Sequence, residues 1–599
     1  MKIRIAILVS FFSLSVEASS EINIQVVYPR ANQQIAAVDS EFIFGSVTPG
    51  SSLTINGQDV RIHKGGGWLA FLPVTPGGFL FRLVASKEND TSYFELPVTI
   101  GVADTVSGLR FIPKEILPSS KAVYSIGDIL EFSFEAPSGG TAWFGLDERP
   151  LIIMYESEGE TDWDGSVFGR KITAAEDADI ARYVGYYHFT QSDTGIHRIC
   201  YQYTNPKQSA VENRVVFKDC KDTLVTVLPH LPWKAGVLSG ESQIVRTAPG
   251  KGYKLLYQPP GVMVNITGLV DSFYRIRLAD GISGYVNVDS VTILPAGTAM
   301  PKGEISYIAV DKTQGGIRIS MNVGARLPYE ISESLTPSSI DVDIFGVTSD
   351  VDWIRYNTDD SLVKLVRWSQ PQDGVFKMTV EVAADSIWGY KSYYVGNDFN
   401  LQLNGSSVRK GTHLKRLKGL RIAIDPGHSH DAGAIGPTGL NEKDANLWIA
   451  YELRQMLERD GAEVMMTRYG HENVPLYDRP RKAEKWGADL LISIHNNALP
   501  DGINPFANNG TSVYYYHPHS KALAEAIHKR MVPATGLPDH GLYYGNLVLT
   551  RYSAAPAVLV ECAFMMIPEQ EALLKTDKFQ RKCARAIRDG IIDFVRGKR

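Results

Sequence analysis

Two histidines and two glutamates in the last third of the chain have the residue types of a metal-dependent hydrolase. His428 follows a short strand-like run that ends in Pro-Gly, and His495 and Glu561 each end an apolar run. Glu442 stands where a helix is expected to begin. Pro and Gly interrupt strands, and open α/β sheets carry their sites at the carboxyl ends of strands. We therefore expect these residues to meet at one rim of one sheet.

The chemistry that this set could perform is the hydrolysis of an amide. A bound zinc ion polarises the carbonyl and lowers the pKa of its bound water to about 7. Catalytic zinc keeps three protein ligands and one open position, and two imidazoles with one carboxylate are a known ligand set. His428, Glu442 and His495 match that set, so Zn²⁺ is the expected cofactor. Glu561 would act as general base toward the water and as acid toward the leaving amine.

Each residue alone also has an ordinary structural interpretation. A single histidine near a strand end is more often structural, and Glu442 alone fits an exposed carboxylate that the helix dipole favours. Glu561 is less ordinary, because a carboxylate that ends an apolar strand needs a partner. The joint placement favours the metal site, and the lack of an HExxH motif excludes a thermolysin-type protease. Other histidines of this region lack a comparable placement: His430, His517, His519, His528 and His540.

The elements that must position this site begin after Lys415, where strands alternate with helical periods and so predict an α/β sheet. Apolar residues recur at helical spacing from Leu447 to Leu457, and Gly461 can end that helix. The other expected elements are strands over 463–468, 490–495, 511–516 and 558–561, and helices over 479–486, 520–531 and 578–596.

The preceding two thirds of the chain show only β patterns, with short apolar runs separated by Pro-Gly, Asn-Gly and Asp-Gly turns. The predicted fold class is multidomain, with several small all-β modules (sandwiches and an SH3-like barrel) followed by a C-terminal α/β domain. The strand rhythms resemble bacterial Ig-like, SH3-like and AMIN modules. The expected divisions are a signal peptide (1–18), an Ig-like sandwich (19–101), an unassigned β-rich domain (102–231), an SH3-like barrel (232–296), an AMIN-like domain (297–405), a linker (406–414) and the α/β domain (415–599).

Two features of the β modules invite a functional interpretation but have a simpler one. An aromatic cluster, Trp388, Tyr390, Tyr393 and Tyr394, could stack on sugar rings, yet core and edge packing is the preferred interpretation. The acidic stretch 155–179 lacks the DxDxDG spacing of an EF-hand loop and is interpreted as a solvated loop.

Charge and targeting signals restrict the partners and the compartment. The net charge is −5, so nucleic-acid binding is not expected. Lys2 and Arg4 precede an apolar run over 5–16. This run is too short to span a bilayer, because a transmembrane helix needs about 20 residues. We expect a signal peptide cleaved after Ala18 and export to the periplasm or the cell exterior, without stable membrane insertion.

The chain has four cysteines and no CxxC pair, which excludes a thiolate zinc site. Export permits a disulfide between Cys200 and Cys220, and the sequence leaves open whether it forms. Cys562 and Cys583 are expected to be buried thiols.

Five ordered motifs carry a family resemblance: DPGHSHDAGAIGPTGLNEKDANL, then TR at 467–468, LYDR at 476–479, ADLLISIHNNA and PAVLVECAF. They resemble the zinc-dependent N-acetylmuramoyl-L-alanine amidases of the type-3 family. The resemblance implies an α/β domain that cleaves the amide between the lactyl group of N-acetylmuramic acid and L-alanine of the stem peptide. It implies His428, Glu442 and His495 as zinc ligands and Glu561 as the catalytic carboxylate, in agreement with the assignment above.

The sequence departs from the family pattern at two places. Ser429 and His430 stand where a second glycine pair is usual, and 565–567 (MMI) stand where Ser-Asn commonly follows. Some family members also carry a helix that blocks the zinc, inserted after the strand that follows the second histidine. Here strand 511–516 is followed at once by helix 520–531, so we expect no self-blocking.

The predicted function is hydrolysis of peptidoglycan by an exported zinc amidase, positioned by β modules that could also bind envelope proteins. Two alternatives remain open from the residues alone. One is a wall-binding scaffold with a degenerate hydrolase domain, since over half of the chain is β modules. The other is a zinc peptidase that acts on a different peptidoglycan amide.

Overall fold

The computed structural model describes residues 22–101, 122–147, 149–157, 180–205, 217–229, 234–240, 243–336, 338–383, 387–405 and 416–597. The expected signal peptide, the linker over 406–414 and most of the acidic stretch lie outside these residues. In the part of the chain that is described, none of the helices combines the length and apolarity needed to cross a bilayer.

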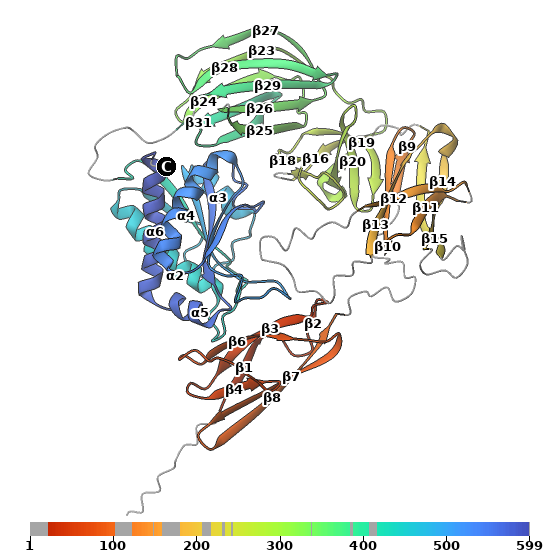
Figure 1. Cartoon of the computed structure of the whole chain (residues 1–599). Helices are drawn as coiled ribbons and strands as arrows, with labels where there is room; N and C mark the ends of the chain where they lie inside the picture. The colour runs from red at the N-terminus through yellow and green to blue at the C-terminus, as the bar shows by residue number, and fades with distance from the viewer. Residues whose placement is uncertain are drawn as a thin grey trace, which may run out of the picture.

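The first β module is a sandwich of a three-stranded and a five-stranded sheet, and Trp68 and Phe81 are fully buried between them. It lies at one end of the molecule, red in Figure 1. Its first sheet has the order β1 (Ile24–Tyr28), β3 (Ser40–Val47), β6 (Gly67–Pro73). Its second has the order β2 (Gln34–Ile35), β8 (Asp90–Ile100), β7 (Gly77–Lys87), β4 (Ser52–Ile55), β5 (Gln58–Asp59).

The next two β regions share one sheet, which crosses the division expected near residue 231. The joining strand is β9 (Ala122–Ser125), which pairs with β15 (Phe217–Leu228) on one side and β19 (Met263–Val270) on the other. The remaining strands of this sheet are β10 (Ile129–Pro137), β11 (Thr141–Leu146), β12 (Ile152–Ser157), β13 (Ile180–His188), β14 (Gly195–Thr204), β16 (Lys234–Leu238), β20 (Phe273–Ala279), β21 (Ile282–Asn287) and β22 (Val291–Ile293), beside a hairpin of β17 (Gln243–Val245) and β18 (Leu255–Gln258).

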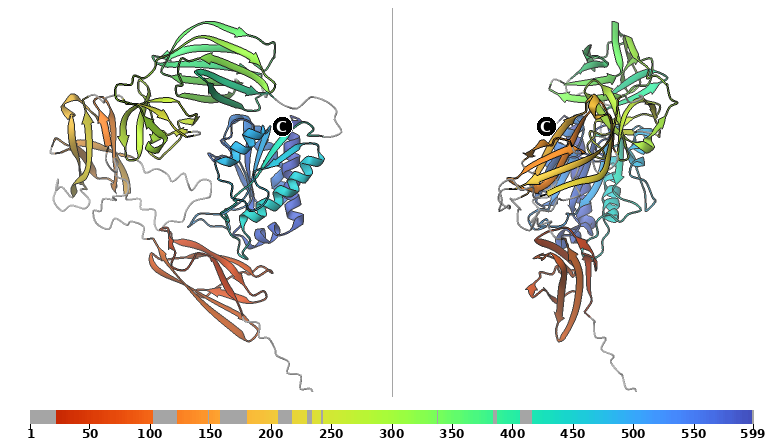
Figure 2. Two further views of the ribbon diagram at one scale, coloured as in Figure 1. Left: turned by 180° about the vertical axis from the view of Figure 1, so that it is seen from behind. Right: turned by 90° about the vertical axis from the view of Figure 1, so that its right-hand side faces the viewer.

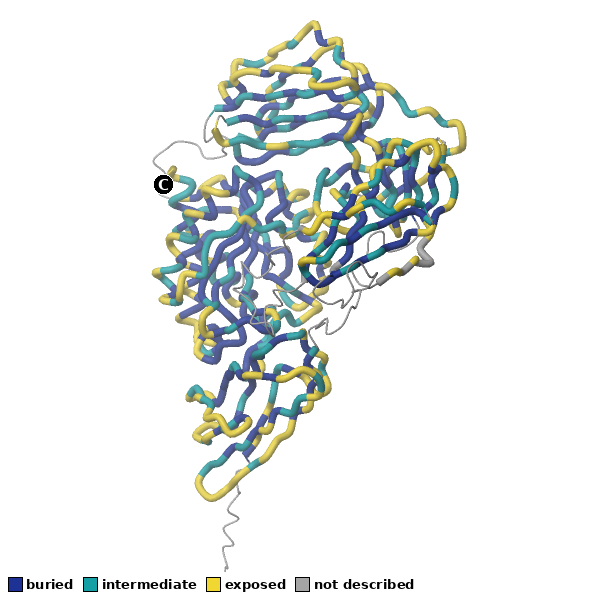
Figure 3. The backbone as a smooth tube through the Cα atoms, turned by 45° about the vertical axis from the view of Figure 1, so that its right-hand side comes forward, coloured by how far each residue is buried: buried dark blue, intermediate teal, exposed yellow. Residues whose placement is uncertain are grey.

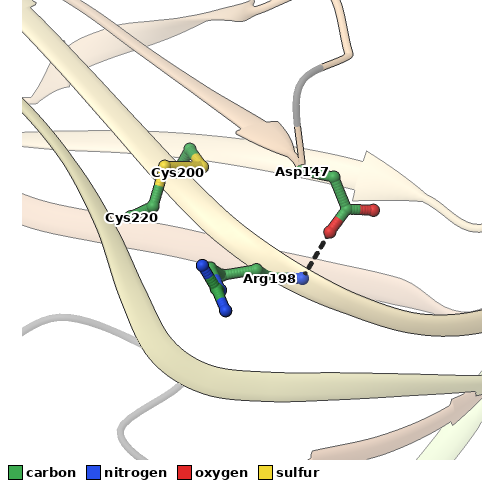
Figure 4. Close-up of a disulfide and its surroundings, with 4 residues drawn as sticks. All are labelled: Asp147, Arg198, Cys200 and Cys220. Atoms are coloured by element: carbon green, nitrogen blue, oxygen red, sulfur yellow. Dashed lines mark hydrogen bonds between the residues drawn. A yellow bond between two sulfur atoms is a disulfide. The ribbon is translucent and has the colours of Figure 1, made fainter.

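A disulfide joins Cys200 and Cys220, which the sequence had left open. The two residues are direct partners across antiparallel β14 and β15, and Figure 4 shows the bond beside the hydrogen bond that the Arg198 N–H donates to Asp147 (2.8 Å). Cys562 and Cys583 are free and buried, as predicted.

The fourth β module is again a two-sheet sandwich, at the opposite end of the C-terminal domain from the first (Figures 1 and 2). The two sheets bury alternate apolar residues between them. Their orders are β27 (Val347–Tyr356), β23 (Gly303–Lys312), β24 (Gly316–Asn322), β31 (Asp398–Asn404), β30 (Tyr390–Val395) and β25 (Tyr329–Leu335), β26 (Ser338–Phe345), β29 (Val375–Val382), β28 (Val363–Gln372).

The C-terminal domain is the predicted α/β sheet covered by helices, and its central strands are buried (Figure 3). The strand order is β33 (Glu463–Met466), β32 (Arg421–Pro426), β34 (Leu490–Asn497), β37 (Ala557–Phe564), β35 (Thr511–Tyr515), β36 (Asp539–Tyr544). All neighbouring pairs are parallel except β35 with β37. Consecutive apolar residues in β32, β34 and β37 fit strands that are covered on both faces.

The helices of this domain are α2 (Glu442–Arg459), α3 (Asp478–Trp486), α4 (Lys521–Thr535), α5 (Pro568–Leu574) and α6 (Asp577–Val595). The predicted apolar stripe of α2 is buried, from Leu447 to Leu457. Helix α4 extends to Thr535, beyond the predicted end at 531, and contains Pro533. Strand β36 and helix α5 were not predicted, because neither has a clear apolar period.

Candidate metal centre and active site

The sheet brings the predicted site residues to one rim. His495 lies on β34 directly opposite Glu561 on β37, and His428 follows the neighbouring strand β32. Glu442 is the first residue of α2. Strands β34 and β37 continue to Asn497 and Phe564, so His495 and Glu561 lie within their carboxyl-terminal halves and do not end them as predicted.

Three of these side chains converge as a group that could hold a metal ion, and we call His428, Glu442 and His495 the rim set. His428 Nε2 lies 3.0 Å from Glu442 Oε2, and His495 Nδ1 lies 2.9 Å from Glu442 Oε1. The two imidazole ring centroids are 5.0 Å apart. The donor types and their convergence fit one zinc ion, for which two imidazoles and one carboxylate are a known set.

Glu442 is fixed by its surroundings and is not the exposed helix-start carboxylate that it could have been, since only 4% of the residue is exposed. It accepts hydrogen bonds from the backbone N–H groups of Ala434 (2.9 Å) and Asn496 (3.2 Å) and from the Asn446 side chain (3.2 Å). Burial raises its pKa, but hydrogen bonds from the two histidines outweigh this and hold the pKa well below its ordinary value. The carboxylate is therefore ready to bind a cation.

The backbone at His428 is unusual, with a φ of 61° in the left-handed region that non-glycine residues rarely adopt. Its Nδ1 is hydrogen-bonded to Asp431, which leaves Nε2 toward Glu442. Burial lowers the pKa of the imidazole, but the hydrogen bond and charge of Glu442, with those of Asp431, raise it above the ordinary value. A carboxylate on the second ring nitrogen is the usual support of a metal-binding histidine.

Two glycines leave the room that the rim set occupies. A Cβ on Gly427 would lie 2.3 Å from the ring of His495. A Cβ on Gly433 would lie 2.5 Å from Glu442 Oε2, and the φ of Gly433 is also positive at 66°. Both glycines belong to the first motif, and glycine is needed at each position because a side chain there would contact the rim set too closely.

Two buried arginines hold the turn that carries His428. Arg479 donates to the carbonyl oxygens of Pro426 (3.0 Å) and His428 (2.8 Å) and pairs with Asp425 (3.0 Å). Arg468 donates to the carbonyl oxygens of Pro426 and Gly427, both at 2.9 Å. The sequence placed these arginines in motifs without a role, and a short arginine-bearing motif near the site was the only signal.

Glu561 lies beside the rim set but is not one of its three members. Its Oε2 is fully buried and has no hydrogen-bond partner among the described residues. Burial, and then the charge of Glu442, raise the pKa of this carboxyl well above its ordinary value. A carboxylate with an unused oxygen beside a cation site is suited to exchange a proton with a water molecule there.

The fold and the rim define an α/β domain with a group of side chains able to hold a metal ion, and comparisons with known proteins identify the family. A profile of N-acetylmuramoyl-L-alanine amidases matches residues 422–593. The chain is 38% identical to the N-acetylmuramoyl-L-alanine amidase LytC of Bacillus subtilis over 196 residues, which cover 32% of this chain and 38% of LytC. It is 32% identical to the amidase AmiA of Escherichia coli over 258 residues, which cover 36% of this chain and 88% of AmiA.

Among solved structures, the catalytic domain of the amidase CwlV from Bacillus (Paenibacillus) polymyxa var. colistinus aligns at 36% identity. The alignment covers 30% of this chain and 98% of that one, with a TM-score of 0.28. On the sequence matches, the chain belongs to the N-acetylmuramoyl-L-alanine amidase family, and its α/β domain is the peptidoglycan amidase.

One departure from the family pattern has a structural explanation. Met566 and Ile567, in the segment after β37, pack in one apolar cluster with Phe42, Phe44 and Leu69 of the first β module. The MMI segment thus forms part of the surface on which that module docks. The other departure, Ser429, is buried and its hydroxyl bonds the backbone of a nearby loop.

Proposed function

We propose that the rim set binds zinc and that Glu561 is the catalytic base and acid of a peptidoglycan amidase. The observation that carries the proposal is the convergence of three possible ligand atoms from β34, α2 and the turn after β32. Beside them lies Glu561 Oε2, which has no hydrogen-bond partner among the described residues. The substrate bond is the amide between N-acetylmuramic acid and L-alanine of the stem peptide.

Each side chain has one task in this proposal. His428, Glu442 and His495 hold the ion, which when bound supplies Lewis-acid polarisation and lowers the pKa of a water ligand. Glu561 accepts the proton of the attacking water and then donates it to the leaving nitrogen of L-alanine. Asp431, Asn446 and the two arginines position the ligands and do not touch the substrate.

The setting of the enzyme follows from the sequence signals. We infer export to the periplasm or the cell wall by the signal peptide over 1–18, where peptidoglycan is the partner. The Ig-like, SH3-like and AMIN-like modules would position the amidase on the wall or on envelope proteins. For the aromatic cluster we favour a packing role over stacking on sugar rings, since Trp388, Tyr390 and Tyr394 are buried.

We also propose that the active site is not self-blocked. Between β35 and α4 the structure has only a single 3-10 turn, Pro518–Ser520, in place of an inserted helix. The purified chain should digest the wall without an activator. The hypothesis fails if digestion requires a partner protein or a deletion within the chain.

The test is digestion of purified peptidoglycan by the full chain, with products identified by mass spectrometry. We expect free stem peptides with an N-terminal alanine, loss of these products in a chelator and recovery on addition of zinc. Fragments cut at another bond would keep the site but change the substrate. Tight binding to intact wall without products would favour a scaffold.

A further inference from the structure

A second group of two histidines and one glutamate lies far from the rim, at the contact between the fourth β module and the amidase domain. It consists of Glu333 on β25 and of His517 and His519, just before α4. We call these three residues the interface set. Their side chains are almost fully buried, at 1%, 7% and 1% exposed respectively.

The interface set resembles the rim set in the short distances between its imidazole nitrogens and its carboxylate oxygen. His519 Nδ1 lies 2.9 Å from Glu333 Oε1, and His517 Nδ1 lies 3.4 Å from the same oxygen. Ligand atoms on a tetrahedral zinc ion with bonds of about 2.0–2.2 Å lie about 3.3–3.6 Å apart. The distance from His517 lies within this range and the distance from His519 is shorter, and both imidazoles present Nδ1 to one carboxylate.

The hydrogen bonds of His517 favour a cation between its Nδ1 and Glu333. His517 Nε2 lies 2.9 Å from the carbonyl oxygen of Arg551, which can only accept, so Nε2 carries the proton. In a neutral ring the lone pair of Nδ1 then faces the carboxylate of Glu333, an unfavourable contact. A metal ion held by Nδ1 resolves it, and a backbone carbonyl on the other ring nitrogen is the usual support of a metal-binding histidine.

The surroundings of Glu333 fit a buried metal ligand. The backbone N–H of His519 donates to Glu333 Oε2 (3.2 Å), and the hydroxyl of Tyr390 is hydrogen-bonded to the same carboxylate. The rings of His517 and His519 are nearly parallel, with centroids 5.2 Å apart. Two stacked imidazoles are better balanced by one shared dication than by a proton on each ring.

We propose that Glu333, His517 and His519 form a second metal site, with zinc as the fitting ion, that fastens the fourth β module to the amidase domain. Its ligands come from both domains, so the ion is a structural link. A backbone hydrogen bond also joins the two domains, from the Tyr390 N–H to the Ser553 carbonyl oxygen (2.7 Å). The proposal does not depend on the activity assigned to the rim set.

The experiment is a zinc count on the full chain after loading with Zn²⁺ and desalting. We expect two zinc ions per wild-type chain and one in the His428→Ala/His495→Ala variant, which leaves the interface untouched. A Glu333→Gln/His519→Asn variant should also bind one, and the combination of all four changes none. His528→Asn is the matched control and should keep two, since it removes an imidazole whose one ion pair among the described residues is with Asp539 (2.7 Å).

In the rim variant, the X-ray absorption spectrum at the zinc edge should show two imidazoles and an oxygen ligand. One zinc ion in the wild type and none in the rim variant would overturn the proposal and leave a proton-bridged cluster. A single zinc ion in the rim variant with a ligand shell that lacks imidazole would overturn it as well.

Discussion

The rim set and the interface set have the same composition but differ in origin and exposure. The rim set comes from one domain, and His428 and His495 keep 28% and 18% of their side chains exposed. The interface set is split between two domains and is almost closed to solvent. The difference shows that the same three donor types can converge at a partly exposed rim within one domain and in a buried contact between two domains.

The largest expected effect is the difference in wall digestion when the glutamate of each set is changed to glutamine. Glu442→Gln removes the carboxylate that contacts both rim histidines. Loss of a supporting contact costs up to about 100-fold, and loss of this carboxylate should reduce wall digestion by more than that. Glu333→Gln should leave digestion within about twofold of wild type. Release of stem peptides measures both, and equal losses in the two variants would break the comparison.

A smaller effect is expected from crowding the rim set without changing a ligand. Gly433→Ala places a Cβ 2.5 Å from Glu442 Oε2. The zinc affinity of the rim should fall by about 10–100-fold, as it does when supporting contacts are lost. Gly439→Ala is the control, since its φ is also positive (85°) but no atom lies within 4 Å of the added Cβ. If both variants bind zinc equally, steric contact with Glu442 is not what matters.

Exposure predicts different rates of metal release. In excess chelator the rim zinc should leave at least about tenfold faster than the interface zinc, because the interface ligands open only when two domains separate. A colorimetric chelator should record two phases, with activity lost in the fast one. Loss of activity in the slow phase would reverse the assignment of the two sets.

The smallest effect concerns a third buried glutamate. Glu41 of the first β module accepts the Gly502 N–H of the amidase (3.0 Å). Burial, and then the charge of Asp501, raise its pKa to about 8. Because this value lies above the about 4.3 of an unfolded chain, its contribution to stability is fully present below about pH 4.3 and is lost as the pH rises through about 8.

The melting temperature should therefore fall as the pH rises from 5 to 9. Glu41→Gln should flatten that dependence, whereas Glu95→Gln, at an exposed pair with Arg82 in the same module, should not. An unchanged pH dependence in Glu41→Gln would show that the carboxyl titrates as in solvent.

The sequence predicted the rim residues because each lies in a short local motif at a strand or helix end. The sequence did not predict that Glu333, His517 and His519 lie together, and it gave the two histidines no role. The reason is that Glu333 is 186 residues from His519, in another domain. No local pattern encodes a pair of that separation. The docking role of Met566 was missed for the same reason, since its partners Phe42 and Phe44 are in the first module.

The pairing of strand β9 could not be predicted for the same reason. Its partners β15 and β19 belong to two regions that the sequence analysis treated as separate domains. The Cys200–Cys220 bond could be allowed but not assigned, because cross-strand register depends on pairing that periodicity does not give. The fold class followed from turn residues and periods, which are local properties.

Glu561→Gln separates the binding of the metal, proposed for the rim set, from the transfer of the proton, proposed for Glu561. Bound zinc and stem-peptide release should be measured together on Glu561→Gln, with Glu569→Gln on the surface of α5 as the control. We expect wild-type zinc content and a rate lower by about 10²–10⁴-fold. A rate within about twofold of wild type would contradict the role of Glu561, and loss of the rim zinc would make Glu561 a ligand instead of the base.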